Sequence, residues 1–375
     1  MTSWQELLKN SITSPDELAV QLDCPVEEIA AVAAKYPLRI NSYYLNLIKK
    51  HGLPLYRQAV PDKRELTDVT GMVDPLAEED LSPVPGLVHK YPDRVLLLVN
   101  HECAMYCRFC TRKRIVGNTR MCASNDQLQQ AFSYLRATPQ VREVLVSGGD
   151  PLLLSDERLE WILTSLRAIP NIDIIRIGSR APCTLPMRIT SKLCAVLQQF
   201  HPLYINTHFN HPAEVTAEAA QACTMLANAG IPLGCQTVLL RGVNDDADTL
   251  AQLFRQLLSI RVKPYYLFQA DLTRGTDHFR TRIEDGLAIM RQLIGQVSGM
   301  AVPTFALDAP GGGGKIPLTP NYIRRYGEVL EFVNYLGNAC WYPNSVCQDS
   351  FASQSKTQPS KNASQENASL SRGSI

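Results

Sequence analysis

Short apolar runs alternate with amphipathic segments through the middle of the chain. The apolar runs, each typical of a buried strand, lie at 95–99, 144–146, 174–177, 203–205, 233–240, 265–268 and 302–307. The helical segments lie at 126–138, 156–168, 188–200, 213–229, 246–260 and 284–298. Alternating strand and helix in units of about thirty residues predicts an α/β fold with a parallel sheet. Because the runs are apolar throughout, we expect both faces of that sheet to be covered.

Polar or glycine-rich residues follow most of these runs. They occur at 147–150, 178–180, 207–211, 269–271 and 308–315. In an α/β barrel the carboxyl ends of all strands face one mouth, whereas a doubly wound sheet concentrates its ligands at one switch point. Because most strand ends here carry polar chemistry, the sequence favours a full or partial (β/α) barrel.

The flanking regions differ from this repeat. The predicted division is a helical N-terminal segment at 1–60, a linker or surface wrap at 61–90, the barrel at 91–315, a helical extension at 316–350 and a disordered tail at 351–375. We expect the N-terminal segment to serve packing or dimerisation, and the extension to carry a helix at 322–336. The tail is rich in Ser, Asn, Gln and Lys, a composition that buries too little apolar surface to fold.

Composition narrows the class of protein. The 375 residues include 37 Lys and Arg against 36 Asp and Glu, so no basic excess predicts nucleic acid or an anionic membrane as a partner. No apolar run approaches the length of a membrane span. The eleven cysteines are spread through predicted core segments, and the N-terminus lacks a signal pattern. We therefore expect a reducing compartment, the cytoplasm.

Three cysteines follow the first apolar run of the repeat. Cys103, Cys107 and Cys110 are spaced by three and then two residues. A [4Fe–4S] cluster takes one thiolate per iron, so three thiolates leave one iron open to a small molecule. A zinc site in a structural or regulatory module is the alternative, with Cys122 or His101 as the fourth ligand. The basic run 112–114 that follows is best explained by a local anionic ligand.

A glycine run precedes a lysine at the end of the last predicted strand. Four consecutive glycines before Lys315 indicate a sharp bend or a close approach to the backbone. The pattern is not a nucleotide P-loop, because Ile316 and Pro317 follow the lysine. Three interpretations remain: a loop that cradles phosphate, an amine placed for a covalent bond to a carbonyl group, or a solvated lysine in a flexible loop.

Charged residues at other strand ends suggest opposite ends of a substrate. Asp271 and Asp308 each end a strand, and can act as acid and base or bind a cation together. Arg112 can pair with a carboxylate through two hydrogen bonds. A ligand that is anionic at one end and cationic at the other describes a basic amino acid. Solvated loop carboxylates are the alternative for the two aspartates.

These residues resemble the lysine 2,3-aminomutase family of radical S-adenosylmethionine enzymes. The resemblance covers roughly residues 40–340, and its motifs are Cys103-x3-Cys107-x2-Cys110-Thr-Arg112, 147–150, 176–180, 208–211, 240–244 and 308–315. It implies a partial-barrel core and an isomerase that interconverts L-lysine and β-lysine. The reaction is a 1,2-amino shift started by a 5′-deoxyadenosyl radical.

The resemblance also implies roles for individual residues. Cys103, Cys107 and Cys110 would hold a [4Fe–4S] cluster whose open iron binds S-adenosylmethionine. The residues implied around that cofactor are Gly148, Gly149, Asp150 and His208. Lys315 would hold pyridoxal 5′-phosphate, with Arg94 at its phosphate and Gln236 near the shared site. The implied substrate contacts are Arg112 for the carboxylate, and Asp271 with Asp308 for the side-chain ammonium.

Substrate and partners follow from the same resemblance. Two aspartates would repel a substrate carboxylate, which favours lysine over glutamate; arginine, or supply of β-lysine for modifying elongation factor P, is the alternative. An electron donor such as flavodoxin or ferredoxin is implied, and a homo-oligomer is compatible with the chain. Well-known members bind zinc through a loop cysteine and a C-terminal cysteine cluster. This chain has Asp245-Asp246 in that loop and only Cys340 and Cys347 near its end, so we predict no structural zinc.

Overall fold

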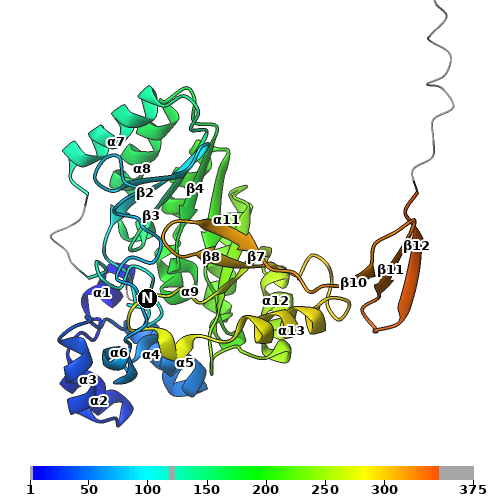
Figure 1. The fold of residues 1–375 in the computed structure, drawn as a ribbon. Coiled ribbons are helices and arrows are strands. Elements are labelled where there is room, and N and C mark those ends of the chain that lie inside the picture. Colours follow the sequence, from blue (N-terminus) through cyan, green and yellow to red (C-terminus); the bar gives the residue numbers. More distant parts are fainter. Residues whose placement is uncertain (1–2, 118–122, 346–375) are drawn as a thin grey trace, which may run out of the picture. The chain divides into compact units, whose positions relative to one another are not determined.

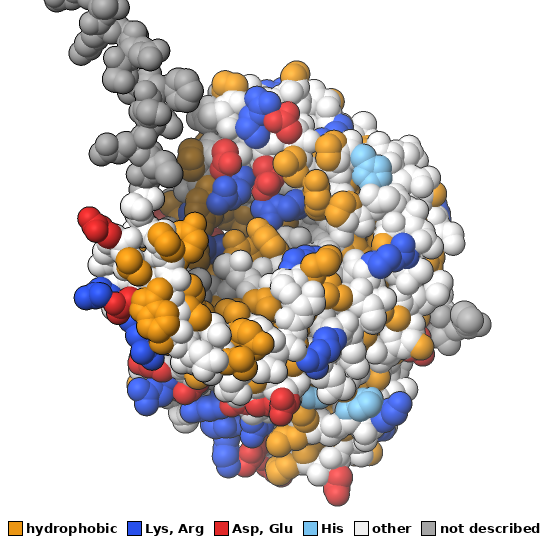
Figure 2. All heavy atoms as spheres, turned by 90° about the vertical axis from the view of Figure 1, so that its right-hand side faces the viewer, with side chains coloured by type: hydrophobic (Ala, Val, Ile, Leu, Met, Phe, Trp, Pro, Cys, Tyr) orange, Lys and Arg blue, Asp and Glu red, His pale blue; other side chains and the backbone are white. Residues whose placement is uncertain are grey.

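Two compact units make up the chain, residues 1–320 and 321–375. This computed structural model describes residues 3–117 and 123–345. The first unit contains a nine-stranded sheet whose strands follow one another in chain order (Figure 1). On the face shown in Figure 2, side chains of both charge signs are interspersed.

The predicted strands all form, and they run parallel to one another. They are β2 (Arg94–Asn100), β3 (Glu143–Gly148), β4 (Ile174–Gly178), β5 (Leu203–Thr207), β6 (Leu233–Leu239), β7 (Val262–Gln269) and β8 (Thr304–Ala309). Two strands that the sequence did not predict pair antiparallel at the edges: β1 (Leu87–Tyr91) with β2, and β9 (Gly314–Pro317) with β8. The backbone N–H of Lys315 on β9 donates to Tyr91 Oη on β1 at 3.0 Å. This contact joins the two edges of the sheet, which confirms the predicted partial barrel.

The helices between the strands also match the prediction. They are α7 (Asn125–Ala137), α8 (Asp156–Arg167), α10 (Ser191–Leu197), α11 (Ala217–Asn228), α12 (Ala247–Ser259) and α13 (Ile283–Leu293), with a short α9 (Ala181–Thr184) after β4. Five of them begin at a side chain that accepts a backbone N–H, which fixes their starts; these caps are Ser124, Ser155, Thr190, Thr216 and Asp246. Their apolar faces and one face of the strands form the main core.

The other face of the strands is less covered than predicted. Along β3 and β6 every second residue is only partly buried, including Leu145 and Ser147 on β3 and Gln236 and Val238 on β6. The expectation of a sheet buried on both faces was therefore wrong for the inner face. A barrel that is not fully closed leaves its interior partly accessible, and the polar residues among the apolar runs lie there.

The N-terminal segment is helical, as predicted, and it packs against residues 101–114, which carry the three cysteines and which we call the cysteine loop. Its helices are α1 (Trp4–Lys9), α2 (Pro15–Leu22), α3 (Val26–Ala33), α4 (Ser42–His51) and α5 (Leu53–Ala59), drawn in blue in Figure 1. Their apolar residues form a second core that includes Met105 from the cysteine loop. The packing role is thereby confirmed. The predicted wrap at 61–90 contains one short helix, α6 (Arg64–Thr67), before β1.

The predicted helical extension at 316–350 is wrong. The second unit contains a three-stranded antiparallel sheet of β10 (Ile323–Arg325), β11 (Val329–Val333) and β12 (Ala339–Pro343). β-Branched and aromatic residues favour strands here, and Gly337 at φ +85° closes the turn between β11 and β12. The predicted disordered tail and Cys347 lie outside the described residues. No helix in the described part of the chain has the length and apolarity needed to cross a membrane.

Candidate active site

The cysteine loop follows β2 and is fixed by the N-terminal helical segment. Tyr106 N–H donates to the Arg39 carbonyl at 3.0 Å, and Arg108 N–H donates to the Gln58 carbonyl at 2.9 Å. The buried Asn41 side chain donates to the Ala104 carbonyl at 3.0 Å. These bonds satisfy backbone groups that lie away from water, so the loop conformation depends on the segment that precedes it.

The three thiols lie in an environment that disfavours free thiolates. Burial and then the charge of Asp150 raise the pKa of Cys103 well above its ordinary value, and burial and then Cys107 raise the pKa of Cys110 to about 11. Cys107 Sγ accepts a hydrogen bond from Arg180 Nη1 at 2.8 Å. A group of thiolates here therefore requires a positive centre, which iron in a cluster supplies.

The two metal alternatives require different arrangements of donors. Within residues 3–117 and 123–345, no three His, Cys, Asp or Glu side chains are arranged to hold one metal ion. A zinc site gathers its ligands tetrahedrally around one ion, whereas each thiolate of an iron–sulfur cluster binds a different iron. The thiolates of a cluster therefore need not converge on one point. Cys122, a ligand of the zinc alternative, lies outside the described residues.

The glycines after β3 let that strand end pack on the cysteine loop. A Cβ on Gly148, whose φ is +145°, would lie 2.1 Å from the Asn100 carbonyl oxygen, and one on Gly149 would lie 2.3 Å from the Glu102 carbonyl oxygen. The backbone N–H of Gly149 donates to Asn100 at 2.5 Å, and that of Asp150 donates to Glu102 at 2.7 Å. No side chain fits at either glycine, so both set the position of the loop.

Asp150 joins the ends of two neighbouring strands. Its buried carboxylate accepts hydrogen bonds from Ser179 Oγ at 2.7 Å and from the backbone N–H groups of Arg180 and Leu152 at 2.9 and 3.0 Å. Burial raises the pKa of Asp150 despite these bonds. Its oxygens are already occupied by the chain, so in this structure Asp150 supports the loop geometry.

The basic residues of the cysteine loop are paired with carboxylates of the chain itself. Glu65 binds Arg108 and Lys113, with Nζ of Lys113 at 2.6 Å. Glu78 binds Arg112, at 2.7 Å from Nη2 and 3.0 Å from Nε. Burial lowers the pKa of Lys113 to about 8. The sequence predicted a local anionic ligand for this run; the anions are instead side chains from the 61–90 segment.

Arg114 completes this set of ion pairs. Its guanidinium lies 3.2 Å from Asp74, 3.5 Å from Glu78 and 3.0 Å from Glu79. The same segment touches the glycine run, because Gly311 N–H donates to the Pro75 carbonyl at 3.0 Å. We call residues 74–81 the acidic strap. It connects the cysteine loop to the loop that precedes Lys315.

Lys315 lies on a hairpin strand rather than in a flexible loop. Asp308 on β8 and Lys315 on β9 face each other in register, and Lys315 Nζ donates to Asp308 Oδ2 at 2.9 Å. Three of the intervening glycines have φ between +69° and +91°, which explains why the turn uses glycine. The hairpin therefore sets the lysine amine directly beside a carboxylate.

A second carboxylate lies next to this pair. Burial and then the charge of Asp308 raise the pKa of Asp271 to about 7, against the lowering effects of Lys315 and Lys90. Lys90, on β1, lies 3.7 Å from Asp308 Oδ1, a buried oxygen that accepts no hydrogen bond among the described residues. Two neighbouring carboxylates repel each other when both are ionised, so the site favours binding of an additional cation.

Aromatic and polar residues surround the lysine amine. Nζ of Lys315 lies 5.1 Å from the ring centroid of Phe268, which stacks on Tyr266 at 4.8 Å. Gln236 is the register neighbour of Tyr266 on the adjacent strand. Arg94 stacks on the Tyr91 ring at 4.0 Å, and Tyr91 accepts the backbone N–H of Lys315. Tyr91 thus contacts both Arg94 and Lys315.

His208 lies beside the cysteine loop. Its ring is 5.5 Å from that of Phe109, which lies between Cys107 and Cys110, and its Nε2 is bonded to Asn210 Oδ1 at 2.9 Å. Burial and, to a smaller extent, the charge of Arg180 lower the pKa of His208 to about 3, which favours the neutral ring.

Sequence reasoning missed three residues of this site: Glu78, Lys90 and Tyr91. Glu78 was part of a predicted linker, and the other two lie on an edge strand within or next to that linker. The one available signal was charge: an acidic stretch and a basic run in one sequence of low net charge suggest that the two segments form ion pairs.

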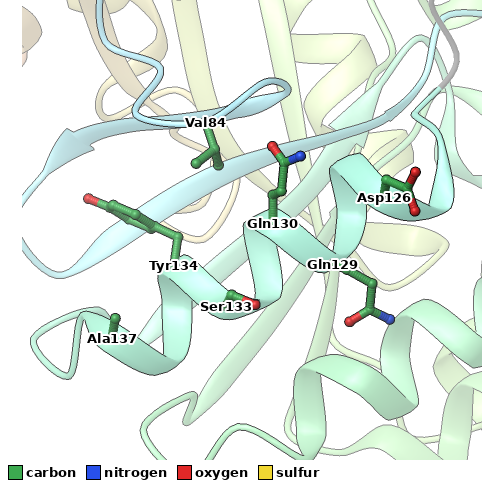
Figure 3. Close-up of a pocket in the computed structure, with 7 residues that line it drawn as sticks. All are labelled: Val84, Asp126, Gln129, Gln130, Ser133, Tyr134 and Ala137. Carbon is green, nitrogen blue, oxygen red and sulfur yellow. The ribbon is translucent and has the colours of Figure 1, made fainter.

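The depression shown in Figure 3 contains no predicted site residue. It lies against α7 and is lined by Val84, Asp126, Gln129, Gln130, Ser133, Tyr134 and Ala137.

Comparison with known proteins agrees with this geometry. The family model described as radical SAM superfamily matches residues 97–254, and the one described as lysine-2,3-aminomutase matches residues 290–370. The chain is 49% identical to the L-lysine 2,3-aminomutase of Fusobacterium nucleatum, over 85% of this chain and 77% of that protein. This chain belongs to the lysine 2,3-aminomutase family. It is thus a radical SAM enzyme of the isomerase class.

Other members of the lysine 2,3-aminomutase family show the range of substrates. The L-lysine 2,3-aminomutase of Clostridium subterminale is 48% identical over 85% of this chain and 78% of that protein. The glutamate 2,3-aminomutase of Clostridioides difficile is 45% identical over 85% of this chain and 76% of that protein. Overall sequence identity therefore does not distinguish a lysine-specific enzyme from a glutamate-specific one. The choice between the two substrates must be argued from the side chains of the site.

Because Gly148 and Gly149 contact the cysteine loop, adding a methyl group at either position is predicted to destabilise the protein. We expect Gly149→Ala to destabilise the protein by about 1–3 kcal/mol, because backbone atoms of Glu102 must move. Gly178→Ala is the matched control, since its Cβ would lie at an ordinary 3.5 Å from Ser147 Oγ. Urea unfolding and iron content after reconstitution measure both variants. Equal stability and equal iron content would contradict the packing role.

Asp271 predicts a pH dependence of stability. Its folded-state pKa of about 7 lies above the unfolded value of about 3.9, so the folded state binds the proton more tightly. Stability from this group is present below pH 4 and is lost as pH rises toward 7. The unfolding free energy of the unmodified protein is expected to fall between pH 5 and pH 8. In Asp271→Asn we expect this fall to be smaller by on the order of 2–4 kcal/mol. Parallel curves for both proteins would contradict the raised pKa.

Proposed function

We propose that this protein interconverts L-lysine and β-lysine, using a [4Fe–4S] cluster, S-adenosylmethionine and pyridoxal 5′-phosphate. The observation that carries the proposal is the pair Asp271 and Asp308 beside the amine of Lys315, with Arg112 on the cysteine loop. The family identity supports the reaction class, and the names of the L-lysine 2,3-aminomutase relatives support the substrate.

The charge of the site supports lysine over glutamate. A glutamate side chain would bring a carboxylate toward two aspartates, and Asp271 is already hard to ionise because of its burial and of the charge of Asp308. A lysine side chain brings an ammonium group, which relieves that repulsion. Ammonium binding also favours the ionised form of Asp271, so substrate binding is expected to release a proton below about pH 7.

The residues present fit the proposed cofactors. Cys103, Cys107 and Cys110 are proposed as the cluster ligands, with the open iron left for S-adenosylmethionine, and Gly148 to Asp150 and His208 support that region. Lys315 is proposed to hold pyridoxal 5′-phosphate, with Arg94 at its phosphate and Gln236 near the ring. When bound, these groups supply the radical and the electron-accepting ring that a 1,2-amino shift needs.

Asp308 and Lys315 have linked roles in this proposal. Lys315 Nζ donates to Asp308 Oδ2 at 2.9 Å, so the ammonium form of Lys315 neutralises Asp308. A covalent bond from that nitrogen to a carbonyl group would require its protons to leave for solvent and would end the ion pair. Asp308 and Asp271 would then be left for the ammonium group of a substrate, so the site would favour a cationic side chain.

Arg112 is proposed to hold the other end of the substrate. A guanidinium presents paired N–H groups that match a carboxylate. Arg112 lies two residues after Cys110, so the carboxylate end of the substrate would lie beside the cluster. The cationic and anionic ends of lysine would thus be held by opposite charges. The carbon chain between them would lie along the partly buried inner face of the strands.

Activity measurement tests the proposal directly. Anaerobic, reconstituted protein with dithionite and S-adenosylmethionine is expected to convert L-lysine to β-lysine, followed by mass spectrometry after derivatisation. We expect kcat/KM for L-lysine to exceed that for L-glutamate and L-arginine by at least about tenfold. Lys315→Ala is expected to lose activity and to retain iron. No β-lysine from protein with a full cluster and bound pyridoxal phosphate would refute the proposal.

Removing one aspartate tests the recognition of the ammonium group. Asp271→Asn is expected to raise KM for L-lysine by about 10–100-fold, because a buried charge pair is lost. Binding of L-norleucine, which lacks the terminal amine, is expected to change less than about twofold. The matched control is Asp248→Asn, which removes an exposed charge on α12. An equal loss for lysine and norleucine would show that Asp271 does not recognise the ammonium.

A further inference from the structure

The acidic strap places a buried carboxylate on the arginine proposed for substrate binding. We propose that Glu78 is a positioning residue, which fixes the guanidinium of Arg112 so that its end-on edge, formed by Nη1 and Nη2, meets the α-carboxylate of the substrate. This inference rests on the proposed function, because it assumes that Arg112 binds that carboxylate. Glu78 itself lies behind Arg112 and is not expected to touch the substrate.

Glu78 occupies one edge of the guanidinium and leaves another. Arg112 Nε lies 3.0 Å from both oxygens of Glu78, and Nη2 lies 2.7 Å from Oε1. Nη1 donates to the Gly148 carbonyl at 3.2 Å and lies 3.5 Å from Ser147 Oγ. A guanidinium has five N–H groups. The bonds to Glu78 include the shortest one, whereas Nη1 donates only long bonds of 3.2 and 3.5 Å to the Gly148 carbonyl and Ser147 Oγ. One N–H of Nη2 has no partner in the part of the chain that the structure describes, and together with Nη1 it forms the end-on edge, where a carboxylate can displace the long bonds and bind through two bonds.

The strap holds Glu78 itself in place. Arg114 Nη2 lies 3.5 Å from Glu78 Oε2, and the next backbone N–H, that of Glu79, donates to Asp74 at 2.9 Å. The side chains of Glu78 and Arg112 are 6% and 16% exposed, so the pair is shielded from competing water. A buried ion pair of this kind has few alternative arrangements, which is what a positioning function requires.

The strap also relates Arg112 to the opposite end of the site. Its Pro75 carbonyl accepts the N–H of Gly311, and a Cβ on Gly312 would lie 2.9 Å from Leu81 Cδ1. These glycines belong to the turn between Asp308 and Lys315. The strap thus contacts both the cysteine loop and the hairpin, so the separation between the carboxylate-binding and ammonium-binding ends depends on it.

Two ligands separate positioning from a general structural role. The probes are L-lysine and pentane-1,5-diamine, which has the same two terminal amines but no carboxylate, and the readout is the absorbance change of bound pyridoxal phosphate in reconstituted holoenzyme. In Glu78→Gln we expect the dissociation constant of L-lysine to rise about tenfold or more, because a misaligned guanidinium loses its two-bond geometry. That of the diamine is expected to change less than about twofold.

Control variants complete the experiment. Glu79→Gln removes an exposed carboxylate from the same strap and is expected to leave both dissociation constants unchanged. Glu78→Asp keeps the charge on a shorter side chain and is expected to show a smaller change in the same direction. It also serves as the test variant if Glu78→Gln fails to fold, as judged by circular dichroism.

Three results would overturn the inference. Tighter lysine binding in Glu78→Gln would show that Glu78 competes with the substrate carboxylate, and equal weakening of both ligands would show a general structural role. Unchanged dissociation constants for both ligands would show no role in binding. Arg112→Gln separates these failures from that of the proposed function. If Arg112→Gln does not weaken lysine more than the diamine, the assignment of Arg112 itself fails.

Discussion

Four cationic side chains of the cysteine loop lie largely out of water, and each is paired with a carboxylate from residues 65–79. Glu65 binds Arg108 and Lys113, and Glu78 binds Arg112 and, at longer range, Arg114. An unpaired charge at such positions would cost several kcal/mol. The loop that carries the three thiols can therefore take this conformation only together with a segment that lies outside the barrel repeat. A stretch that reads as a linker thus determines the geometry of the site.

The same dependence explains the glycines better than a direct contact with a ligand does. Gly148 and Gly149 let the end of β3 approach the backbone of the cysteine loop, and the glycines before Lys315 form a tight turn that touches the acidic strap. A side chain at Gly148 or Gly149 would collide with the backbone of the cysteine loop, and one at Gly312 would lie 2.9 Å from Leu81 of the acidic strap. These glycines hold the loops in register with one another.

Much of the fold was predictable, because local patterns dominate where strands and helices alternate. The predicted strands and helices of the barrel form with small shifts at their ends, and caps such as Ser155 and Thr216 account for the helix starts. The errors occur where pairing partners are distant. The segment 322–336 has too few contacts of its own to decide between helix and strand, and pairing with β12 makes it a sheet. The edge strands β1 and β9 were missed for the same reason, since each is defined by its neighbour.

The sequence by itself determined the barrel repeat, the grouping of three thiols on one loop, and the presence of a lysine and two aspartates at strand ends. These follow from spacing and periodicity, which act over a few residues. Only the tertiary structure decided that Lys315 faces Asp308 across a hairpin, that the pKa of Asp271 rises to about 7, and that Glu78 occupies one edge of Arg112. Burial and ion pairing depend on segments that are far apart in the chain. The sequence shows which charged residues can form ion pairs, and only the fold decides which of them meet.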